Sequence, residues 1–498
     1  GRISYIPYVN GILQKNHIDN SYQNNFSYGG DLRIPVGSGL NIDLTINPDF
    51  SQVEVDNEII NLTMFEIKME EKRQFFLQNK DIFSNFGAIR TTNPFFTRRI
   101  GLARNLDGDI IQNKIIGGVR LSGKINKNLK FGFLSMMTDE DLSNEIPSNL
   151  NTVISLHQKV FSSSALKFLF INREITKDYD FVEKNDKYNR FLGIEYDLNS
   201  KDNVWNGRFF AYNSFSPLED EDGFSGGVRI RKQTRKHKIS FEYSYLGDDY
   251  RTDLGILRRV GASKFCPYYE YTVFPKKGKL NNISFGFYYW LWFNLNSNTE
   301  NILENNFNIP VVFTFNNQSE IQIMYRKTSQ YFPKNFDPTG INKENPLAGN
   351  KTYNSNSLQI LYESNPTEKF YFIVSQNYGK FFEGQKYSFA NSLNLRLQPK
   401  LLASMIFNYD RIKLSHLKNK ANIWLVGPKI DYTFSKKLFW SSLIQFSSQS
   451  ENFGINSRLQ WRFKGLSNLF LVYNDNYLVD HEIIPRTRSL NLKLVHWF

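Results

Sequence analysis

The chain has 498 residues, 16% of them aromatic and 22% charged, with a formal net charge of +13. Its single cysteine excludes an internal disulfide framework, and its six histidines are scattered, so we expect neither a metal site nor a cofactor. The basic balance invites a nucleic-acid interpretation. Bases and acids alternate throughout, however, and no nucleic-acid-binding module is recognisable, so we expect no nucleic acid as a partner.

High aromatic content in a chain of polar average character is typical of a transmembrane β-barrel, although a soluble array of β-sandwiches could share it. No stretch approaches the roughly 18 uninterrupted apolar residues that a spanning helix needs. The chain opens on strand-like sequence without a signal peptide, which suggests a mature or trimmed chain. Whether a domain precedes residue 1 stays open.

Strand-like segments of about 9–14 residues recur along the whole chain, a length suited to crossing a bilayer at a tilt. We count about 24 of them and accept a range of 20–26. Their connections alternate between short turns and long polar loops, as in barrels with short periplasmic turns and long external loops. The sequence therefore predicts an all-β fold, a large transmembrane antiparallel β-barrel that forms one domain over residues 1–498.

Within the strands, apolar residues alternate with polar ones, and several polar positions carry arginine. An arginine that faces lipid at the bilayer midplane costs roughly 2–4 kcal/mol, whereas one in a wet lumen costs little. We therefore expect a basic lumen wall, against the alternative of the solvated outer face of a soluble sheet. The predicted wall residues are Arg229, Arg231, Arg396, Arg458 and Arg462.

The C-terminal residues have the pattern of a barrel-assembly signal. Leu490, Leu492, Leu494 and Phe498 share one face, and the chain stops on an aromatic residue. This resembles the C-terminal recognition strand of outer-membrane barrels, although His496 stands where an apolar residue is usual. We expect a location in the outer membrane of a Gram-negative bacterium, with outer-membrane lipids and the barrel-assembly machinery as partners.

Residues 50–108 interrupt the strand series and are predicted to form a partly helical plug inside the barrel. Apolar residues between 59 and 69 suit a short helix, and Phe75, Phe76, Phe95 and Phe96 suit a small apolar core. We expect the acids of the segment to pair with lumen arginines and its bases with lumen carboxylates. Packing is the expected primary role, and direct contact with a ligand is the alternative. The predicted plug residues are Asp49, Gln52, Glu54, Asp56, Glu71, Lys72, Arg73, Phe75, Phe76, Arg98 and Arg99.

Three blocks in this region resemble a group of uncharacterised outer-membrane β-barrel proteins. In that group, a domain of unknown function often follows a carbohydrate-binding module of the family-9 type. The resemblance implies an outer-membrane location and a loose link to glycans, but no reaction, and the module itself has no counterpart here. Gln78 stands where the group leads us to expect an acid. The blocks cover residues 47–54, 71–77 and 95–101.

We carry three functional hypotheses. The first is passage or surface binding of a saccharide or anionic ligand through a plugged, basic lumen. The second is a non-conducting scaffold that anchors surface or periplasmic lipoproteins or an N-terminal domain. The third is a surface glycan hydrolase; because no catalytic motif is present, we expect no catalytic residues and no enzyme activity.

Overall fold

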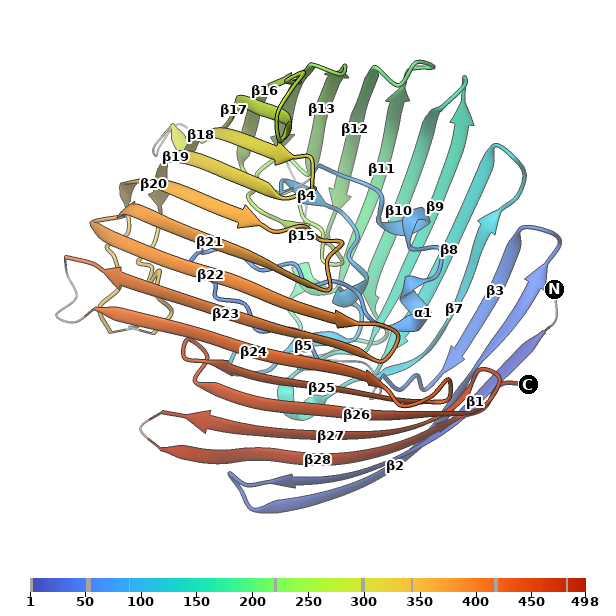
Figure 1. Cartoon of the computed structure of the whole chain (residues 1–498). Helices are drawn as coiled ribbons and strands as arrows, with labels where there is room; N and C mark the ends of the chain where they lie inside the picture. The colour runs from blue at the N-terminus through green and yellow to red at the C-terminus, as the bar shows by residue number, and fades with distance from the viewer. Residues whose placement is uncertain are drawn as a thin grey trace.

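The computed structural model describes residues 3–50, 55–88, 90–218, 222–296, 301–341, 344–415, 420–480 and 482–498. In it, 24 antiparallel strands form one sheet that closes on itself, because β1 pairs with both β2 and β28 (Figure 1). The backbone amides of His496 and Phe498 donate to the carbonyls of Pro7 and Tyr5, so both chain ends lie at one rim. The prediction of an all-β antiparallel barrel of about 24 strands is confirmed.

The barrel strands follow the chain in order, each paired with its neighbours in sequence once the short strands are set aside. They are β1 (Ser4–Asn16), β2 (Ser21–Val36), β3 (Leu40–Ile46), β7 (Ile115–Lys124), β8 (Leu129–Thr138), β9 (Asn149–Val160), β10 (Ser164–Ile175), β11 (Tyr188–Asn199), β12 (Trp205–Phe215), β13 (Phe224–Gln233), β14 (His237–Leu246), β16 (Ala262–Val273), β17 (Leu280–Asn294), β18 (Ile302–Phe315), β19 (Glu320–Phe332), β20 (Lys351–Glu363), β21 (Phe370–Phe381), β22 (Gly384–Leu397), β23 (Leu401–Lys413), β24 (Ala421–Thr433), β25 (Leu438–Ser447), β26 (Asn452–Lys464), β27 (Ser467–Val479) and β28 (Ile483–Val495).

The remaining elements are short and lie in the connections. Two two-stranded sheets join β4 to β15 and β5 to β6. The elements are α1 (Gln74–Leu77), α2 (Lys80–Ser84), β4 (Thr92–Asn93), η1 (Thr97–Arg99), β5 (Leu102–Arg104), β6 (Ile110–Gln112), η2 (Leu142–Asn144), η3 (Lys184–Asp186) and β15 (Ile256–Leu257).

Alternation along each strand separates an apolar outer face from a polar inner one. In β20, Leu358 and Ile360 are about half exposed, whereas Ser357 lines an internal cavity. In β14, Ile239, Phe241 and Tyr243 are exposed, while Ser240 and Ser244 are buried. An apolar belt around a closed barrel with a polar interior is the arrangement of a protein that spans the outer membrane.

The two rims of the barrel differ. One rim, which also holds the chain ends, carries short turns such as residues 125–128 and 161–163. The other carries the longer connections, among them residues 176–187 and 247–261. We call these the short-turn rim and the long-loop rim. The segment that follows β3 leaves the wall at Ile46, which pairs with Gly30 in the middle of β2.

The predicted helix between residues 59 and 69 is wrong. Residues 55–69 run as irregular chain, and the helical turns of this region are α1 and α2, which follow it. Ile60 and Leu62 instead pack against an apolar cluster of β19–β24 and their loops. An extended chain rises more per residue than a helix, so it can carry the side chains of this stretch to partners that are farther apart. No helix in the described ranges is long and apolar enough to cross a bilayer.

We expect Leu358→Arg to destabilise the barrel and Ser357→Arg to be tolerated. These neighbours lie near the middle of β20, where an arginine costs roughly 2–4 kcal/mol on the lipid side and little on the lumen side. Urea titrations of the protein refolded into lipid vesicles measure the difference. Equal losses from the two substitutions would contradict the assignment of the faces.

Candidate functional site

The segment between β3 and β7, residues 47–114, lies within the ring of strands (Figure 1), and we call it the inserted segment. Its two ends meet at the wall, since Ile46 and Gly117 are paired and the Asn47 amide donates to the Ile116 carbonyl at 2.7 Å. Side chains of the wall reach it from all around the ring. They include Ser122, Lys130, Ser155, Lys167, Glu195, Arg208, Lys264, Gln445 and Lys493.

Charged side chains of the inserted segment pair mainly with one another. The Arg73 guanidinium donates to both carboxylate oxygens of Glu71, at 2.8 and 2.7 Å, and to the carbonyls of Thr97 and Ile100. Arg98 pairs with Asp56, and Arg99 with Glu66 at 2.5 Å. The expected pairing of these residues with opposite charges of the wall is therefore wrong. Two residues of the same segment are separated by a shorter stretch of chain, so bringing them together costs less conformational entropy.

The wall, in turn, binds the inserted segment largely through its backbone. In the turn after α2, the Lys167 ammonium donates to the Asn85 carbonyl at 2.5 Å. The Gly87 amide donates to Glu195 Oε1 at 2.6 Å, and the Gly87 carbonyl accepts from Arg208 at 2.9 Å. Gly87 has φ +87°, and a Cβ there would lie 2.1 Å from the Thr92 carbonyl oxygen, so this turn requires glycine.

A second attachment lies at the end of α1. Arg120, buried on β7, donates to the carbonyls of Phe75 and Gln78 and pairs with Asp43 of β3 at 2.6 Å. A cation at a helix C-terminus satisfies carbonyls that have no intrahelical partner. The Gln78 side-chain oxygen accepts from Arg33 and from Arg120. The amide at this position therefore supplies the acceptor for which an acid was expected.

The apolar core of the inserted segment is shared with the barrel. Phe76 and Phe95 are buried in one cluster with Ile82, Phe83 and side chains of β7–β12 and β17, and Phe75 packs against that cluster. The guanidinium of Arg73 lies 4.2 Å from the ring centre of Phe76. Phe96 lies outside the cluster, beneath the Lys68 ammonium. The segment has no separate core, so its packing depends on the closed wall.

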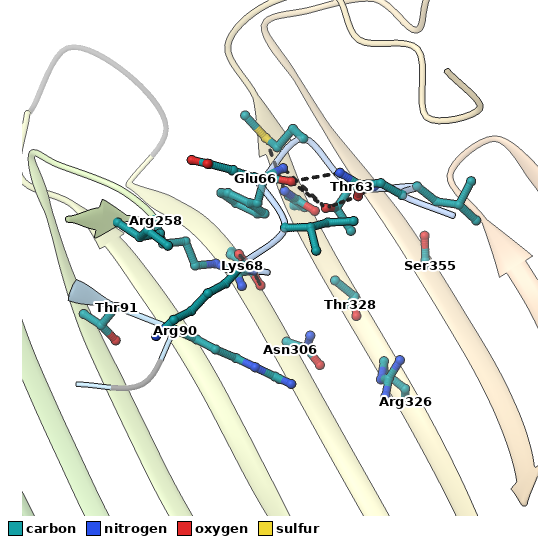
Figure 2. A pocket seen from close by; sticks show the side chains of 18 of the residues that line it. Thr63, Glu66, Lys68, Arg90, Thr91, Arg258, Asn306, Arg326, Thr328 and Ser355 are labelled. Carbon is teal, nitrogen blue, oxygen red and sulfur yellow. Dashed lines mark hydrogen bonds and ion pairs between the residues drawn. The ribbon is translucent and has the colours of Figure 1, made fainter. Parts of the chain in front are cut away.

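Two large cavities lie beside the inserted segment. The first, of about 1100 Å³, is bounded by residues 59–68, 84–88 and 90–93 and by the wall from β12 to β23, and we call it the cationic chamber (Figure 2). Eight cationic side chains line it against three carboxylates. The cations are Lys68, Arg90, Arg208, Arg229, Arg258, Arg326, Lys380 and Lys386, and the carboxylates are Glu66, Glu304 and Asp410.

Three arginines of the cationic chamber make no ion pair within the described ranges. Arg90 reaches from the inserted segment toward the wall strands that carry Asn306 and Arg326 (Figure 2). Its backbone is held at φ +57°, and its only described side-chain partner is the Trp290 ring at 5.1 Å. Arg326 donates to the Asn308 amide oxygen, and the buried Nε of Arg229 has no partner. These groups leave uncompensated positive charge in the chamber.

The second cavity, of about 1680 Å³, lies on the other side of the inserted segment, and we call it the amide chamber. Five carboxylates and four cations line it, so its charge is nearly balanced. Its wall is rich in amide side chains, namely Asn25, Asn47, Gln112, Asn113, Gln445, Asn452, Asn456, Asn474, Asn476 and Asn491. The inserted segment thus divides two spaces of different chemistry.

The predicted plug residues gather mostly at the amide chamber, which is lined by Asp49, Asp56, Glu71, Lys72, Arg73 and Arg98. The Asp49 carboxylate lies 3.6 Å from the Lys493 ammonium, and the Lys72 ammonium 3.6 Å from Asp56. Arg99 also donates to the Gly255 carbonyl, away from both chambers. Gln52 and Glu54 lie outside the described residues.

The predicted wall arginines do not form one site. Arg229 lines the cationic chamber, and Arg231 follows it two residues along β13. Arg396 donates to the Pro366 carbonyl and Arg462 lies over the Phe439 ring, both near the short-turn rim. Arg458 lies on β26, on the far side of the ring from β13.

The sequence analysis did not identify several cations of the cationic chamber, although strand alternation could have indicated some of them. Arg208 and Arg326 occupy the inward phase of predicted strands, the same phase that identified Arg229. Arg90 and Arg258 lie in connections, where strand alternation carries no information. Their convergence depends on how the inserted segment folds back.

The C-terminal strand has the expected faces. Leu490, Leu492 and Leu494 are exposed on the outer side, while Asn491 and Lys493 are buried on the inner side. Phe498 is exposed, its ring stacks with Tyr5, and His496 lies between Phe463 and Phe498. The imidazole therefore packs in an aromatic row, where an apolar residue was expected. An assembly signal at Leu494 and Phe498 stays a prediction.

Comparisons with known proteins give a family and structural neighbours. A family model described as "Domain of unknown function (DUF5916)" matches residues 1–494. No curated protein matches the chain. A mutant of the ferric enterobactin receptor PfeA from Pseudomonas aeruginosa, solved with enterobactin, is similar over 99% of this chain and 81% of its own, with 8% identity and a TM-score of 0.47.

Two further solved structures are similar at the same level. The siderophore receptor PirA from Pseudomonas aeruginosa has 10% identity and a TM-score of 0.45 over 100% of this chain and 80% of its own. The ferric yersiniabactin uptake receptor FyuA from Yersinia pestis has 9% identity and a TM-score of 0.44 over 99% and 80%.

We expect Glu71→Gln to loosen the inserted segment. Burial alone would raise the pKa of the Glu71 carboxyl, but hydrogen bonds from Arg73 and Thr97 outweigh it and hold the pKa below its ordinary 4.5. Removing one partner of a buried ion pair costs roughly 3–5 kcal/mol. Hydrogen exchange of residues 71–100, measured by mass spectrometry, should therefore accelerate in the variant.

The same pKa sets a pH dependence. A depressed carboxyl pKa stabilises the segment fully above the ordinary value, and that contribution is lost as the pH falls through the lower value. Exchange corrected for its intrinsic pH dependence should therefore rise below about pH 4.5 in the wild type and less in Glu71→Gln. The exposed neighbour Glu70 provides the control, since Glu70→Gln should leave both results unchanged. An equal response from the two variants would contradict a structural role for the Glu71 pair.

Proposed function

The chain belongs to the DUF5916 family, whose description states no function, and from the geometry we propose that it binds an anionic ligand in the cationic chamber and passes it across the outer membrane. The inserted segment serves as the plug. The saccharide ligand and the association with a carbohydrate-binding module have no support in the comparisons and stay predictions.

The observation that carries the proposal is the charge of the chamber. Eight cations against three carboxylates line a space of about 1100 Å³. Cations at positions shielded from water bind anions more strongly than exposed ones, because less of the interaction is screened. Arginine also presents several donors in a fixed plane, which suits carboxylates and phosphates. A multiply charged carboxylate, phosphate or sulfate fits this lining.

The position of the inserted segment supports a gating role. It separates the two chambers, and its attachments from β7 round to β28 hold it across the lumen. Both its ends leave the wall at one point, where Ile46 pairs with Gly117. For a ligand to pass, the inserted segment must then shift while its two ends stay attached to the wall.

A second candidate is a neutral, hydroxyl-rich ligand in the amide chamber. The ten amides that line this chamber offer donors and acceptors without net charge, which suits hydroxyl groups. A saccharide of the kind expected from the sequence would bind there rather than among the arginines. A non-conducting scaffold remains the third candidate, and conductance separates it from the other two.

We expect removal of the inserted segment to open the barrel. Ile46 and Gly117 are paired across neighbouring strands, so residues 48–113 can be replaced by Gly-Gly without parting β3 from β7. Single-channel recordings in planar bilayers should show rare or no openings in the wild type and a steady conductance, at least several-fold larger, in the variant. A wild-type conductance equal to that of the variant would contradict a plug.

We expect the double variant Arg229→Gln, Arg326→Gln to lose affinity for anions. Charge-assisted hydrogen bonds contribute about 1.5–3 kcal/mol each, so affinity should fall at least tenfold. Calorimetry with inorganic tripolyphosphate as the probe, on the full chain in detergent, measures the loss. The control variant, Lys277→Gln with Lys436→Gln, removes the same charge from short turns and should bind as the wild type does. Equal binding by all three proteins would contradict the proposed site.

A further inference from the structure

At one edge of the barrel wall, on β2, the sheet is not continued by any described strand. β2 (Ser21–Val36) pairs with β1 from Ser21 to Arg33. On its other side it pairs with β3 only from Gly30 to Val36, because β3 ends at Ile46 and the chain turns inward there. Residues 21–29 of β2 therefore pair on one side only among the described residues. We call this stretch the open edge.

Every second residue of the open edge directs its backbone groups away from β1. The Asn47 side-chain amide donates to the Tyr28 carbonyl at 2.7 Å and so shows which way that carbonyl faces. Successive residues of a strand direct their backbone groups to alternate sides. The N–H and C=O groups of Tyr22, Asn24 and Phe26 consequently face the same gap, without the neighbouring strand that satisfies such groups elsewhere in the wall.

The open edge lies at the level of the apolar belt. The pairing of β28 with β1 and of β1 with β2 places Leu494, Val9 and Tyr28 in one row. The next row in the same phase contains Leu492, Gly11 and Phe26. Lipid offers no hydrogen bonds, so unpaired backbone groups at this level cost several kcal/mol each unless a polar partner covers them.

The sequence of the open edge does not protect it. Edge strands in proteins are usually shortened, bulged, or marked with lysine or proline, which prevents further strands from adding. Residues 21–29 read Ser-Tyr-Gln-Asn-Asn-Phe-Ser-Tyr-Gly and contain no charge and no proline. The outward side chains of Phe26 and Tyr28 are 74% and 72% exposed, because nothing packs against their free flank.

The amide chamber reaches this same place. Its lining includes Phe26 and Tyr28 from the outer face of β2 and Asn25 and Ser27 from the inner face. The amide chamber therefore continues from the lumen to the open edge of β2. A strand added at that edge would form the outer wall of the chamber.

We infer that the open edge of β2 receives an extended segment of a second polypeptide, which adds to the barrel sheet as an antiparallel strand. The segment is about nine residues long and alternates apolar with small polar side chains. The apolar ones lie beside Tyr22, Phe26 and Tyr28, and the polar ones face the amide chamber beside Asn25 and Ser27. Strand addition of this kind takes its affinity from backbone hydrogen bonds and its specificity from alternate side chains.

A second copy of the chain fits less well. Two barrels in one membrane have the same orientation, so the open edges of two copies would meet as parallel strands. A lipid would leave most of the backbone donors unpaired. A separate extended segment satisfies the geometry and the hydrogen bonds together.

The test uses the full chain in lipid nanodiscs and a fluorescent peptide with the sequence of residues 40–46. This peptide copies β3, which already pairs with the same side of β2. Amides of the outward positions Ile42 and Leu44 face β2, whereas those of Asp43 and Thr45 face β7. N-methylation at Ile42 and Leu44 should therefore weaken binding at least tenfold, and N-methylation at Asp43 and Thr45 should change it less than twofold. Anisotropy titrations measure both effects.

Protein variants give an independent comparison. Phe26→Lys places a protecting charge on the open edge and should weaken peptide binding at least tenfold. Phe285→Lys puts the same charge on the outer face of β17, outside the amide chamber, and should bind the peptide as the wild type does. The heat-induced shift of the folded barrel in gel electrophoresis verifies that both variants are folded.

A photoreactive side chain at position 26 identifies what occupies the edge. We expect it to crosslink to the peptide when the peptide is present. Absence of peptide binding to the wild type, equal binding of the two methylated peptides, or crosslinks to lipid or to a second copy that the peptide does not displace would each overturn the inference.

Discussion

Each backbone amide of a strand that crosses lipid needs a partner within the protein, and closure of the sheet supplies one along almost the whole wall. This constraint requires the sheet of 24 strands to close, and it closes because β1 pairs with both β2 and β28. It also explains the importance of residues 21–29 of β2, which lack a second neighbouring strand among the described residues. The chain leaves the wall after Ile46 to build the inserted segment, and β2 extends beyond it without a neighbour.

Charge follows the same division between wall and lumen. A charged side chain is costly in hydrocarbon, so the acids and bases of the strands lie on the inner face, where they meet water or the inserted segment. The cluster of Lys167, Glu195 and Arg208 is nearly closed to solvent, yet each member also binds backbone of the turn at Gly87. Buried ion pairs of this kind add little net stability compared with apolar packing, but they are costly to break. They fix the position of the inserted segment more than they add to the stability of the barrel.

How much of the fold and of the candidate site can be predicted from the sequence depends on how far apart in the chain the interacting residues lie. Alternation along a strand is local, and it identified the faces of β14 and the inward phase of Arg229 correctly. The apolar residues between 59 and 69 were misinterpreted as a helix because their partners are set by the barrel. Ile60 packs on a cluster whose members lie more than 270 residues away, such as Phe332 and Leu414. The pairing of Arg73 with Glu71 was missed for the opposite reason, since the wall was expected to supply partners that the segment already contained.

The two chambers bear on how a ligand would move. The inserted segment is tied to the wall by its own ends, where Ile46 pairs with Gly117, and its attachments to β10–β12 and to β25 lie on different sides of the ring. Loss of the contacts on one side frees that half of the segment while the other half holds. The side near β25 is held mainly by amide hydrogen bonds, such as those of Gln445 with Asp56 and Glu58, at 3.0 and 2.6 Å. Neutral hydrogen bonds contribute about 1 kcal/mol each, less than the charged contacts at Lys167 and Arg208. A ligand that shifts the segment therefore meets less resistance near β25 than near β10–β12, and the contacts near β25 border the amide chamber, which also reaches the open edge of β2.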